Sequence, residues 1–409
     1  MNTWLTISPD SDFSIHNLPF GIFSKNGGSK HVGVAIGDYV IDLGAAQELG
    51  AFDGLNVTND VLENDFLNDF IALGKPTTNA VRLRLQEHLC DDSSPLKDSD
   101  ALIPMNDVQM HLPVKVGDYT DFYSSIEHAT NVGKMFRDPE NALLPNWKHL
   151  PVGYHGRASS IVVSGVDIHR PKGQTKPPEG DPVYGPSQRM DFELEMAFIV
   201  GKPTELGDQI TTENAMDHIF GMVLFNDWSA RDIQKWEYVP LGPFLGKSFA
   251  SSISPWVVTM EALEPFKVAG PEQDPPVLDY LKTDGALNFD LNLTVEIEPD
   301  GSEPTVVSNS NFKYMYWNMA QQLAHHTVNG CNVNIGDMMA SGTISGKSPD
   351  SYGSMLELSW AGKNPVNLND GSERKFLNDG DTVTMKGHCE KDGTRVGFGE
   401  VRSKLLPAK

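Results

Sequence analysis

MDFELEMAFIV, the sequence of residues 190–200, alternates between polar and apolar side chains in a pattern typical of a β-strand with two different faces. The apolar face is explained as core. The other face carries Asp191, Glu193 and Glu195, and side chains two apart on a strand lie roughly 6–7 Å from one another. Carboxylates in such a row repel one another unless water or a cation relieves the repulsion. Two interpretations follow: a solvated edge of a sheet, or half of a site for a hard divalent cation.

Size and composition predict a large, mainly β protein with two domains. The chain has 409 residues, of which 39% are hydrophobic. A chain of this length usually folds around two hydrophobic cores rather than a single one. The 37 glycines and 27 prolines indicate many turns, and therefore a β-rich fold. Near Gly117, aromatic, histidine, arginine and acidic residues begin to crowd together. We therefore predict a scaffold domain over residues 1–116 and a chemically active domain over residues 117–409.

The formal net charge of −23 excludes some classes of partner. Nucleic acids and anionic membrane surfaces are bound through clustered Lys and Arg, so we expect neither as a partner. A small anionic substrate is compatible with this charge if positive groups or a metal are concentrated in the site.

Cysteine usage and the N-terminus indicate a cytoplasmic protein. Cys90, Cys331 and Cys389 form no CxxC pair, so we expect reduced thiols and no zinc site. Residues 1–13 lack the basic and apolar segments of a signal peptide. No apolar run approaches the ~20 residues that span a bilayer.

Short periodic patterns predict the local structure. Two β-prone runs around Gly37-Asp38 predict a hairpin, and apolar side chains at helical spacing predict helices elsewhere. The predicted strands are residues 31–36, 39–43, 222–225, 289–297, 354–360, 382–385 and 395–398; the predicted helices are 63–73, 77–89 and 312–326; and the predicted irregular surface segment is 170–186.

Asp227 ends a buried strand and precedes a polar stripe. An acid at a strand end, where a loop opens, commonly points into a site. Arg231, Gln234 and Tyr238 then follow at i, i+3 and i+7, so on a helix they share one face. A guanidinium, an amide and a phenol aimed the same way suit an anionic, oxygen-rich ligand. A polar surface stripe is the alternative interpretation.

Asp121, His128 and Glu357 form a second set of candidates. Asp121 is a possible fourth carboxylate of the cation site, and His128 follows seven residues later. A histidine held by a carboxylate is a competent general base, because its pKa lies near neutrality. Glu357 has apolar neighbours, so if buried it needs a partner, and orienting His128 would supply one.

Two loops bracketed by glycine add cations and an aromatic side chain. One is residues 153–157, GYHGR, with Tyr154 and Arg157; the other is residues 246–251, GKSFAS, with Lys247. The second is not a phosphate loop, because the GxxxxGK[ST] frame is absent.

These segments together resemble the fumarylacetoacetate hydrolase family, with order and spacing matched from about residue 15 to the C-terminus. The matching motifs are DYTDFY (118–123), GYHGR (153–157), ELE (193–195), FNDWSARD (225–232), PLGPFLGKS (240–248) and SGTISG (341–346). The resemblance implies an N-terminal SH3-like barrel, a C-terminal mixed β-sandwich roll and a homodimer. It also implies hydrolysis of 4-fumarylacetoacetate to fumarate and acetoacetate, the last step of tyrosine and phenylalanine catabolism.

The resemblance also implies roles for individual residues. His128 matches the catalytic base and Glu357 its orienting partner. The implied ligands of Ca²⁺ or Mg²⁺ are Asp121, Glu193, Glu195 and Asp227, with Lys247 and Ser251 beside them. The implied substrate contacts are Tyr123, Arg137, Tyr154, Gln234, Tyr238 and Thr343. Ser251 stands where the family often has threonine and keeps the hydroxyl. Asp191 matches no ligand position, so we expect it to face solvent or a cationic neighbour.

The residue types fit this chemistry independently. Cleaving a carbon–carbon bond in a β-diketone needs a base for water, for which His128 is suited, and donors for an oxyanion. Arg231, Gln234 and Lys247 are the predicted donors, and a chelated metal would stabilise the departing enolate. Two alternatives remain: a metal-dependent decarboxylase or hydratase of 2-oxo acids, which needs no His128–Glu357 pair, and a non-catalytic protein stabilised by metal.

Overall fold

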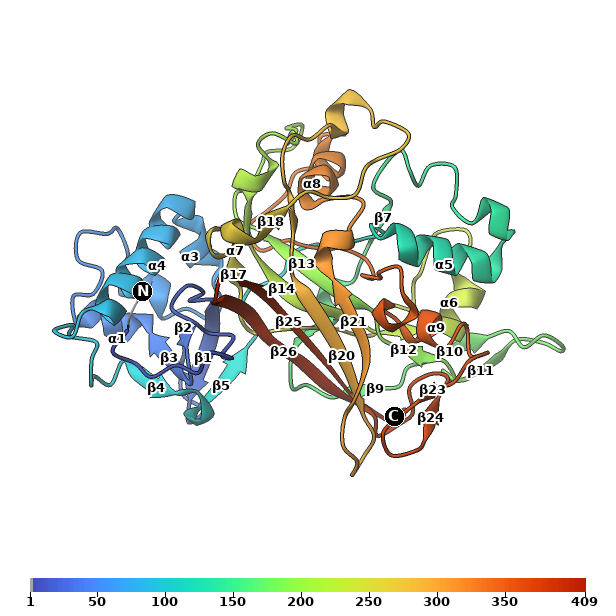
Figure 1. Cartoon of the computed structure of the whole chain (residues 1–409), viewed down its shortest axis with the longest axis horizontal. Coiled ribbons are helices and arrows are strands. Elements are labelled where there is room, and N and C mark those ends of the chain that lie inside the picture. The colour runs from blue at the N-terminus through green and yellow to red at the C-terminus, as the bar shows by residue number, and fades with distance from the viewer. Residues whose placement is uncertain (1–2) are drawn as a thin grey trace.

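The computed structural model describes residues 3–409 and is mainly β (Figure 1). Met1 and Asn2 lie outside the described residues. They belong to the predicted first domain, residues 1–116, and to the segment 1–13 in which we expect no signal peptide. The N-terminal part, blue in Figure 1, lies at one end of the molecule, and the long C-terminal strands pass back toward it. Within residues 3–409, no helix combines the length and the apolar character needed to cross a bilayer.

The N-terminal part is a five-stranded sheet with helices. The sheet has the order β4-β3-β2-β1-β5, and the predicted hairpin is confirmed, with Val34 opposite Ile41. The strands are β1 (Phe20–Lys25), β2 (Lys30–Ile36), β3 (Tyr39–Asp42), β4 (Leu102–Pro104) and β5 (Val108–His111), and the helices are α1 (Leu43–Glu48), α2 (Asn59–Leu62), α3 (Asn68–Ala72) and α4 (Lys75–Cys90).

Both helices predicted in this part exist with different bounds. The pattern at 63–73 becomes the shorter α3, and α4 begins at Lys75 and not at Thr77. Gly74 has φ +84° and separates the two helices, and a proline follows in the first turn of α4, where its missing N–H costs nothing.

An eight-stranded sheet forms the centre of the chain, with the order β7-β6-β22-β13-β14-β16-β8, and β17 pairs with β14 beside this path. Most neighbours are antiparallel, whereas β6–β22 and β16–β8 are parallel pairs. The strands are β6 (Tyr119–Phe122), β7 (Gly153–His155), β8 (Ile161–Val163), β13 (Leu194–Val200), β14 (Ile219–Asp227), β16 (Ser251–Ile253), β17 (Val258–Thr259) and β22 (Met338–Ala340).

The stretch at 190–200 is two strands rather than one. Met190–Asp191 (β12) pairs with Ser229–Ala230 (β15), and the chain joins the large sheet as β13 only at Leu194. All seven residues of β13 are buried, and the three acids are at most 5% exposed. The solvated-edge interpretation is therefore wrong.

A second five-stranded sheet, with the order β21-β20-β25-β26-β9, packs against the large one. A Cβ added at Gly387 of β25 would lie 3.0 Å from the Leu224 side chain of β14, so glycine allows this close approach. The strands are β9 (Ile168–His169), β20 (Asn292–Glu298), β21 (Thr305–Asn311), β25 (Thr382–Lys391) and β26 (Thr394–Leu406).

Four predicted segments differ from the structure. The single strand expected at 289–297 is divided into β19 (Asn288–Phe289) and β20. The helix expected at 312–326 is a 3-10 turn followed by α8 (Met319–Thr327), because Asn318 and Gln321 form a capping box that starts the helix anew. The strand expected at 354–360 is the short helix α9 (Met355–Leu358). The irregular segment at 170–186 contains the hairpin of β10 (Lys172–Thr175) and β11 (Val183–Pro186), which projects from the molecule in Figure 1.

One hydrophobic cluster crosses the predicted domain boundary. Phe20 of β1 packs on Phe220 of β14 with ring centroids 6.2 Å apart. Phe20 and Val257 also exchange backbone hydrogen bonds of 3.0 and 2.7 Å. The predicted domain boundary between residues 116 and 117 falls in the segment between β5 and β6. Because the two parts share a hydrophobic core, their division into two domains stays a prediction.

Candidate active site

Four buried carboxylates meet at one end of the large sheet. Asp121 belongs to β6, Glu195 to β13 and Asp227 to β14, while Glu193 lies in the break between β12 and β13. Each offers an oxygen within 4.8 Å of the others, and each residue is at most 5% exposed. The sequence placed these four acids in one cation site, and the structure brings them together.

Strand pairing explains this convergence. In the β14–β16 pair Asp227 stands opposite Ser251, whose Oγ donates to Asp227 Oδ1 at 2.9 Å. In the β6–β7 pair Asp121 stands opposite Tyr154, whose hydroxyl donates to Asp227 Oδ2 at 3.1 Å. The loop after β22 closes the cluster, with Gly342 N donating to Glu195 Oε2 at 3.0 Å.

Lys247 and Arg231 compensate part of the negative charge. The Nζ of Lys247 contacts Glu193 Oε2 and lies 2.6 Å from Asp227 Oδ2, and Arg231 Nη2 lies 2.7 Å from Glu193 Oε1. Burial opposes the charge on Lys247, but Asp227 and Glu193 outweigh it, so the pKa of Lys247 lies above its ordinary value. Burial likewise opposes ionisation of Glu193, but Lys247 and Arg231 outweigh it and lower its pKa.

Two carboxylates of the cluster remain uncompensated. Asp121 Oδ1 and Glu195 Oε1 are buried and have no hydrogen-bond partner among residues 3–409. Burial and then the neighbouring carboxylates raise the pKa of both groups well above the ordinary range. Buried, oxygen-only donors that repel one another fit a hard divalent cation.

A histidine–carboxylate pair lies beside this cluster. His128 Nδ1 is 2.6 Å from Glu357 Oε2, and both residues are buried. His128 lies in α5 (Ile126–Phe136), whose N-cap Ser125 accepts from the His128 backbone N–H. The Tyr123 ring packs edge-on against the imidazole, with centroids 5.2 Å apart.

Glu357 is held by more partners than the sequence indicated. Its oxygens accept from Asn131 Nδ2 and from the hydroxyls of Ser345 and Ser354, each at 2.9 Å. Burial opposes its ionisation, but His128 and these donors outweigh it, so the pKa of Glu357 is lowered. The spacing Ser354-x-x-Glu357 is a helix-start signal and Asn131 follows His128 by one helical turn, so both were detectable in the sequence.

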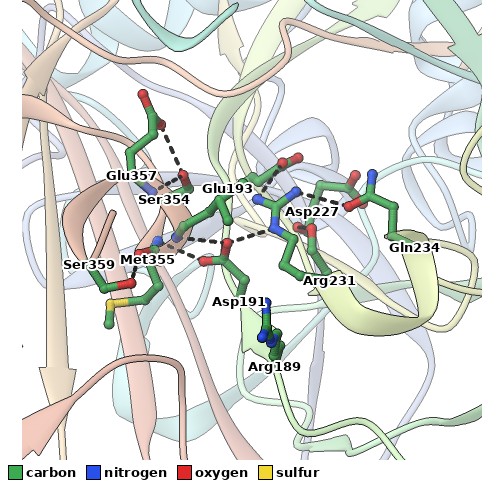
Figure 2. Close-up of polar contacts among 12 residues, drawn as sticks. Arg189, Asp191, Glu193, Asp227, Arg231, Gln234, Ser354, Met355, Glu357 and Ser359 are labelled. Carbon is green, nitrogen blue, oxygen red and sulfur yellow. Dashed lines mark hydrogen bonds and ion pairs between the residues drawn. The ribbon is translucent and has the colours of Figure 1, made fainter. Parts of the chain in front are cut away.

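The predicted polar face is partly present. Arg231 and Gln234 lie in α6 (Arg231–Glu237), and Arg231 Nη1 donates to Gln234 Oε1 at 3.2 Å (Figure 2). Tyr238 ends this helix and is 51% exposed. Gln234 therefore joins the Arg231 side of the site, whereas the Tyr238 side chain faces outward.

Two of the remaining predicted substrate contacts lie close to the carboxylates or the dyad, and a third does not. Tyr154 contacts Asp227, and Thr343 is buried in the loop that closes over Glu195. Arg137 is exposed and donates to Ala142 O at 2.8 and 3.1 Å. The structure does not bring Arg137 into contact with the carboxylate cluster.

One of the two environments expected for Asp191 is present. It has a cationic neighbour, since Arg231 Nε donates to Asp191 Oδ2 at 2.7 Å, but it does not face solvent. It is fully buried and accepts two backbone N–H groups of α9, as Figure 2 shows. The sequence could not give these partners, because they lie 164 and 165 residues away.

Comparisons with known proteins agree with this geometry. The family described as Fumarylacetoacetate (FAA) hydrolase C-terminal matches residues 118–405, and the one described as Fumarylacetoacetase N-terminal matches residues 16–113. The fumarylacetoacetase of Caenorhabditis elegans is 56% identical to this chain over 420 residues, covering 100% of both. That of Homo sapiens is 55% identical over 414 residues, covering 99% of both.

A solved structure shows the same fold at lower identity. The fumarylacetoacetate hydrolase from Exiguobacterium antarcticum is 18% identical, with a TM-score of 0.54, over 96% of this chain and 100% of its own. This likeness concerns the fold alone. The family matches together span both parts of the chain, and the curated relatives match it from end to end. The chain therefore belongs to the fumarylacetoacetate hydrolase family.

Proposed function

We propose that the protein hydrolyses 4-fumarylacetoacetate to fumarate and acetoacetate, the last step of tyrosine and phenylalanine catabolism. Relatives named fumarylacetoacetase that match over the full length support this activity. The observation that carries it is the buried His128–Glu357 pair beside four carboxylates. A decarboxylase or hydratase needs the carboxylates but not this pair.

His128 is the proposed base. Glu357 holds Nδ1–H, so Nε2 is left to take the proton of a water molecule that attacks the substrate carbonyl. The oxyanion formed on that carbonyl accepts hydrogen bonds from Arg231, Gln234 and Lys247. The carbon–carbon bond then breaks, its electron pair stays on the acetoacetate carbon, and Lys247 delivers the proton to that carbon.

Asp121, Glu193, Glu195 and Asp227 would hold the divalent cation, with Lys247 and Ser251 beside them. When bound, the cation supplies Lewis-acid stabilisation of the diketone oxygens. Ca²⁺ and Mg²⁺ are the proposed ions, and four carboxylates suit the looser shell of Ca²⁺ better than that of Mg²⁺.

Substrate recognition is proposed for six polar side chains, namely Tyr123, Arg137, Tyr154, Gln234, Tyr238 and Thr343. Arg137 would exchange its bond to Ala142 O for a substrate carboxylate. Tyr238 would approach with the exposed segment that follows α6.

A homodimer in the cytosol is also proposed. Large apolar side chains are exposed on the 236–245 segment and on the β10–β11 hairpin: Trp236, Val239, Leu241, Phe244, Leu245, Val183 and Tyr184. Trp236 Nε1 donates to Gln174 Oε1 at 3.4 Å and so links α6 to the hairpin. Exposed apolar side chains on both segments support the proposal that they contact a second copy. The three free cysteines fit a reducing compartment. An SH3-like barrel is proposed for the N-terminal part, and its small five-stranded sheet supports this proposal.

Product analysis tests the proposed activity. The protein is incubated with fumarylacetoacetate, and fumarate and acetoacetate are measured by NMR with and without a chelator. Equal amounts of both products, lost on chelation and restored by Ca²⁺ or Mg²⁺, are expected. Release of CO₂, or a hydrated product without cleavage, would identify the decarboxylase or hydratase instead. Unchanged substrate with retained metal binding would indicate the non-catalytic protein.

A further inference from the structure

The carboxylate of Asp191 lies between the two halves of the site. On one side Arg231 Nε donates to Oδ2 at 2.7 Å. On the other side Met355 N donates to Oδ1 at 2.7 Å and Leu356 N donates to Oδ2 at 3.0 Å. The side chain is fully buried, so water does not compete for these contacts.

Each neighbour of Asp191 leads directly to a group of the proposed mechanism. Arg231 contacts Glu193 and Gln234 through its other nitrogens. Met355 and Leu356 form the first turn of α9, which also carries Glu357 (Figure 2). Glu357 in turn contacts His128. The same carboxylate therefore contacts the oxyanion donor and the turn that carries the partner of the base.

We infer that Asp191 is a positioning residue that fixes the Arg231 guanidinium and the Glu357 turn relative to each other. The inference rests on the proposed function. A carboxylate suits this position because both oxygens accept, and three N–H donors converge on them. An amide has one acceptor oxygen and would turn its NH₂ toward one of these donors. Misplacing catalytic groups by about 1 Å lowers turnover by about 100-fold.

A matched control exists elsewhere in the chain. Asp381 is 1% exposed, accepts from Arg374 Nε and Nη2 at 2.8 and 2.9 Å, and accepts Asn378 N at 2.8 Å. Its side-chain contacts in the described chain include no residue of the site. Asp381→Asn therefore makes the same chemical change in an equally buried Asp–Arg pair.

Steady-state kinetics on the metal-loaded protein give the first test. Asp191→Asn is expected to lower kcat about 100-fold with little change in KM, because its partners act in the transition state. Asp381→Asn is expected to lower the melting temperature but to leave kcat unchanged. Equal loss of kcat in the two variants overturns the inference, since it would show only a shared effect of destabilisation.

Hydrogen exchange tests the coupling without turnover. Arg231→Lys removes the fork that grips Asp191, so amide exchange is expected to accelerate at residues 354–359, on the far side of that carboxylate. Arg374→Lys is the control and should leave this segment unchanged. If exchange at 354–359 is the same in both variants, Asp191 does not couple the two sides. This result stands whether or not the parent protein cleaves fumarylacetoacetate, so the inference and the proposed function fail separately.

Discussion

The imidazole Nδ1 of His128 lies 2.6 Å from the carboxylate Oε2 of Glu357, although the two residues are 229 positions apart. Helix α5 brings one and helix α9 brings the other, and both side chains are buried. The contact fixes the ring orientation and keeps Nε2 free to accept a proton. The first prediction concerns this pair.

His128→Ala is expected to lower kcat by about 10²–10⁴-fold, the usual contribution of a general base. Cation binding should persist, because the hydrogen bonds of the carboxylate cluster do not involve this imidazole. Turnover and calorimetric titration with Ca²⁺ measure the two effects on the same sample. Retained turnover would rule out His128 as the base.

Glu195→Gln is expected to weaken divalent-cation binding at least about tenfold, because it removes one buried anionic oxygen ligand. Glu390→Gln changes the same group where it is 58% exposed and serves as the control. Isothermal titration and the rise of melting temperature with added cation give independent measurements. Equal affinity in both variants would place the cation elsewhere.

Ser251 allows a comparison of two substitutions. Ser251→Thr keeps the hydroxyl that donates to Asp227 at 2.9 Å and is expected to retain activity. Ser251→Ala removes the hydroxyl that donates to Asp227 Oδ1, and a buried oxygen left without this hydrogen bond lowers the free energy of unfolding by about 1–3 kcal/mol. Unfolding in urea and kcat measured on both variants distinguish them. The prediction is wrong if alanine matches threonine.

Glu357 should make stability depend on pH. Its pKa is lowered in the folded state, so its contribution to stability is present above the unfolded value of about 4.3 and is lost as the pH falls through the folded pKa. The stability difference between the parent protein and Glu357→Gln should therefore shrink on acidification below about pH 4. Urea midpoints between neutral and acidic pH measure it, and a constant difference would contradict this account.

Gly133→Ala tests how closely helix α5 packs against the loop that follows it. An added Cβ would lie 2.0 Å from Ala142 O, so either the helix that carries His128 or the following loop must move. Destabilisation by about 1–3 kcal/mol is expected, with a loss of kcat. Gly185→Ala is the control, because nothing lies within 4 Å of its added Cβ. Identical stability of the two variants would contradict the packing described.

Local patterns predicted those elements whose partners lie nearby in sequence. The hairpin around Gly37-Asp38 is confirmed because turn and strands are contiguous. The alternation in residues 190–200 correctly indicated a strand with two different faces. It did not indicate that the acidic face is also buried, because the loop after β22 and helix α9, which cover that face, come from distant parts of the sequence.

The errors have physical causes. At 354–360 the alternation of apolar residues suggested a strand, but Ser354 caps a helix and its hydroxyl accepts the Glu357 N–H. At Asn318 a capping box overrides a continuous apolar stripe. The order of the motifs in the sequence was enough to predict that the four carboxylates share one cation site. The distances between these carboxylates, the hydrogen-bond donors around Glu357 and the burial of Asp191 depend on tertiary packing and could not be predicted.

The paired backbone hydrogen bonds between Phe20 and Val257 determine how substitutions in the N-terminal part affect the enzyme. Because they join the two parts through one core, the whole chain should melt in a single transition. A substitution in the first hundred residues then acts on the quantity of intact enzyme in the cell, through chaperones and proteases, while each surviving molecule keeps its normal turnover number.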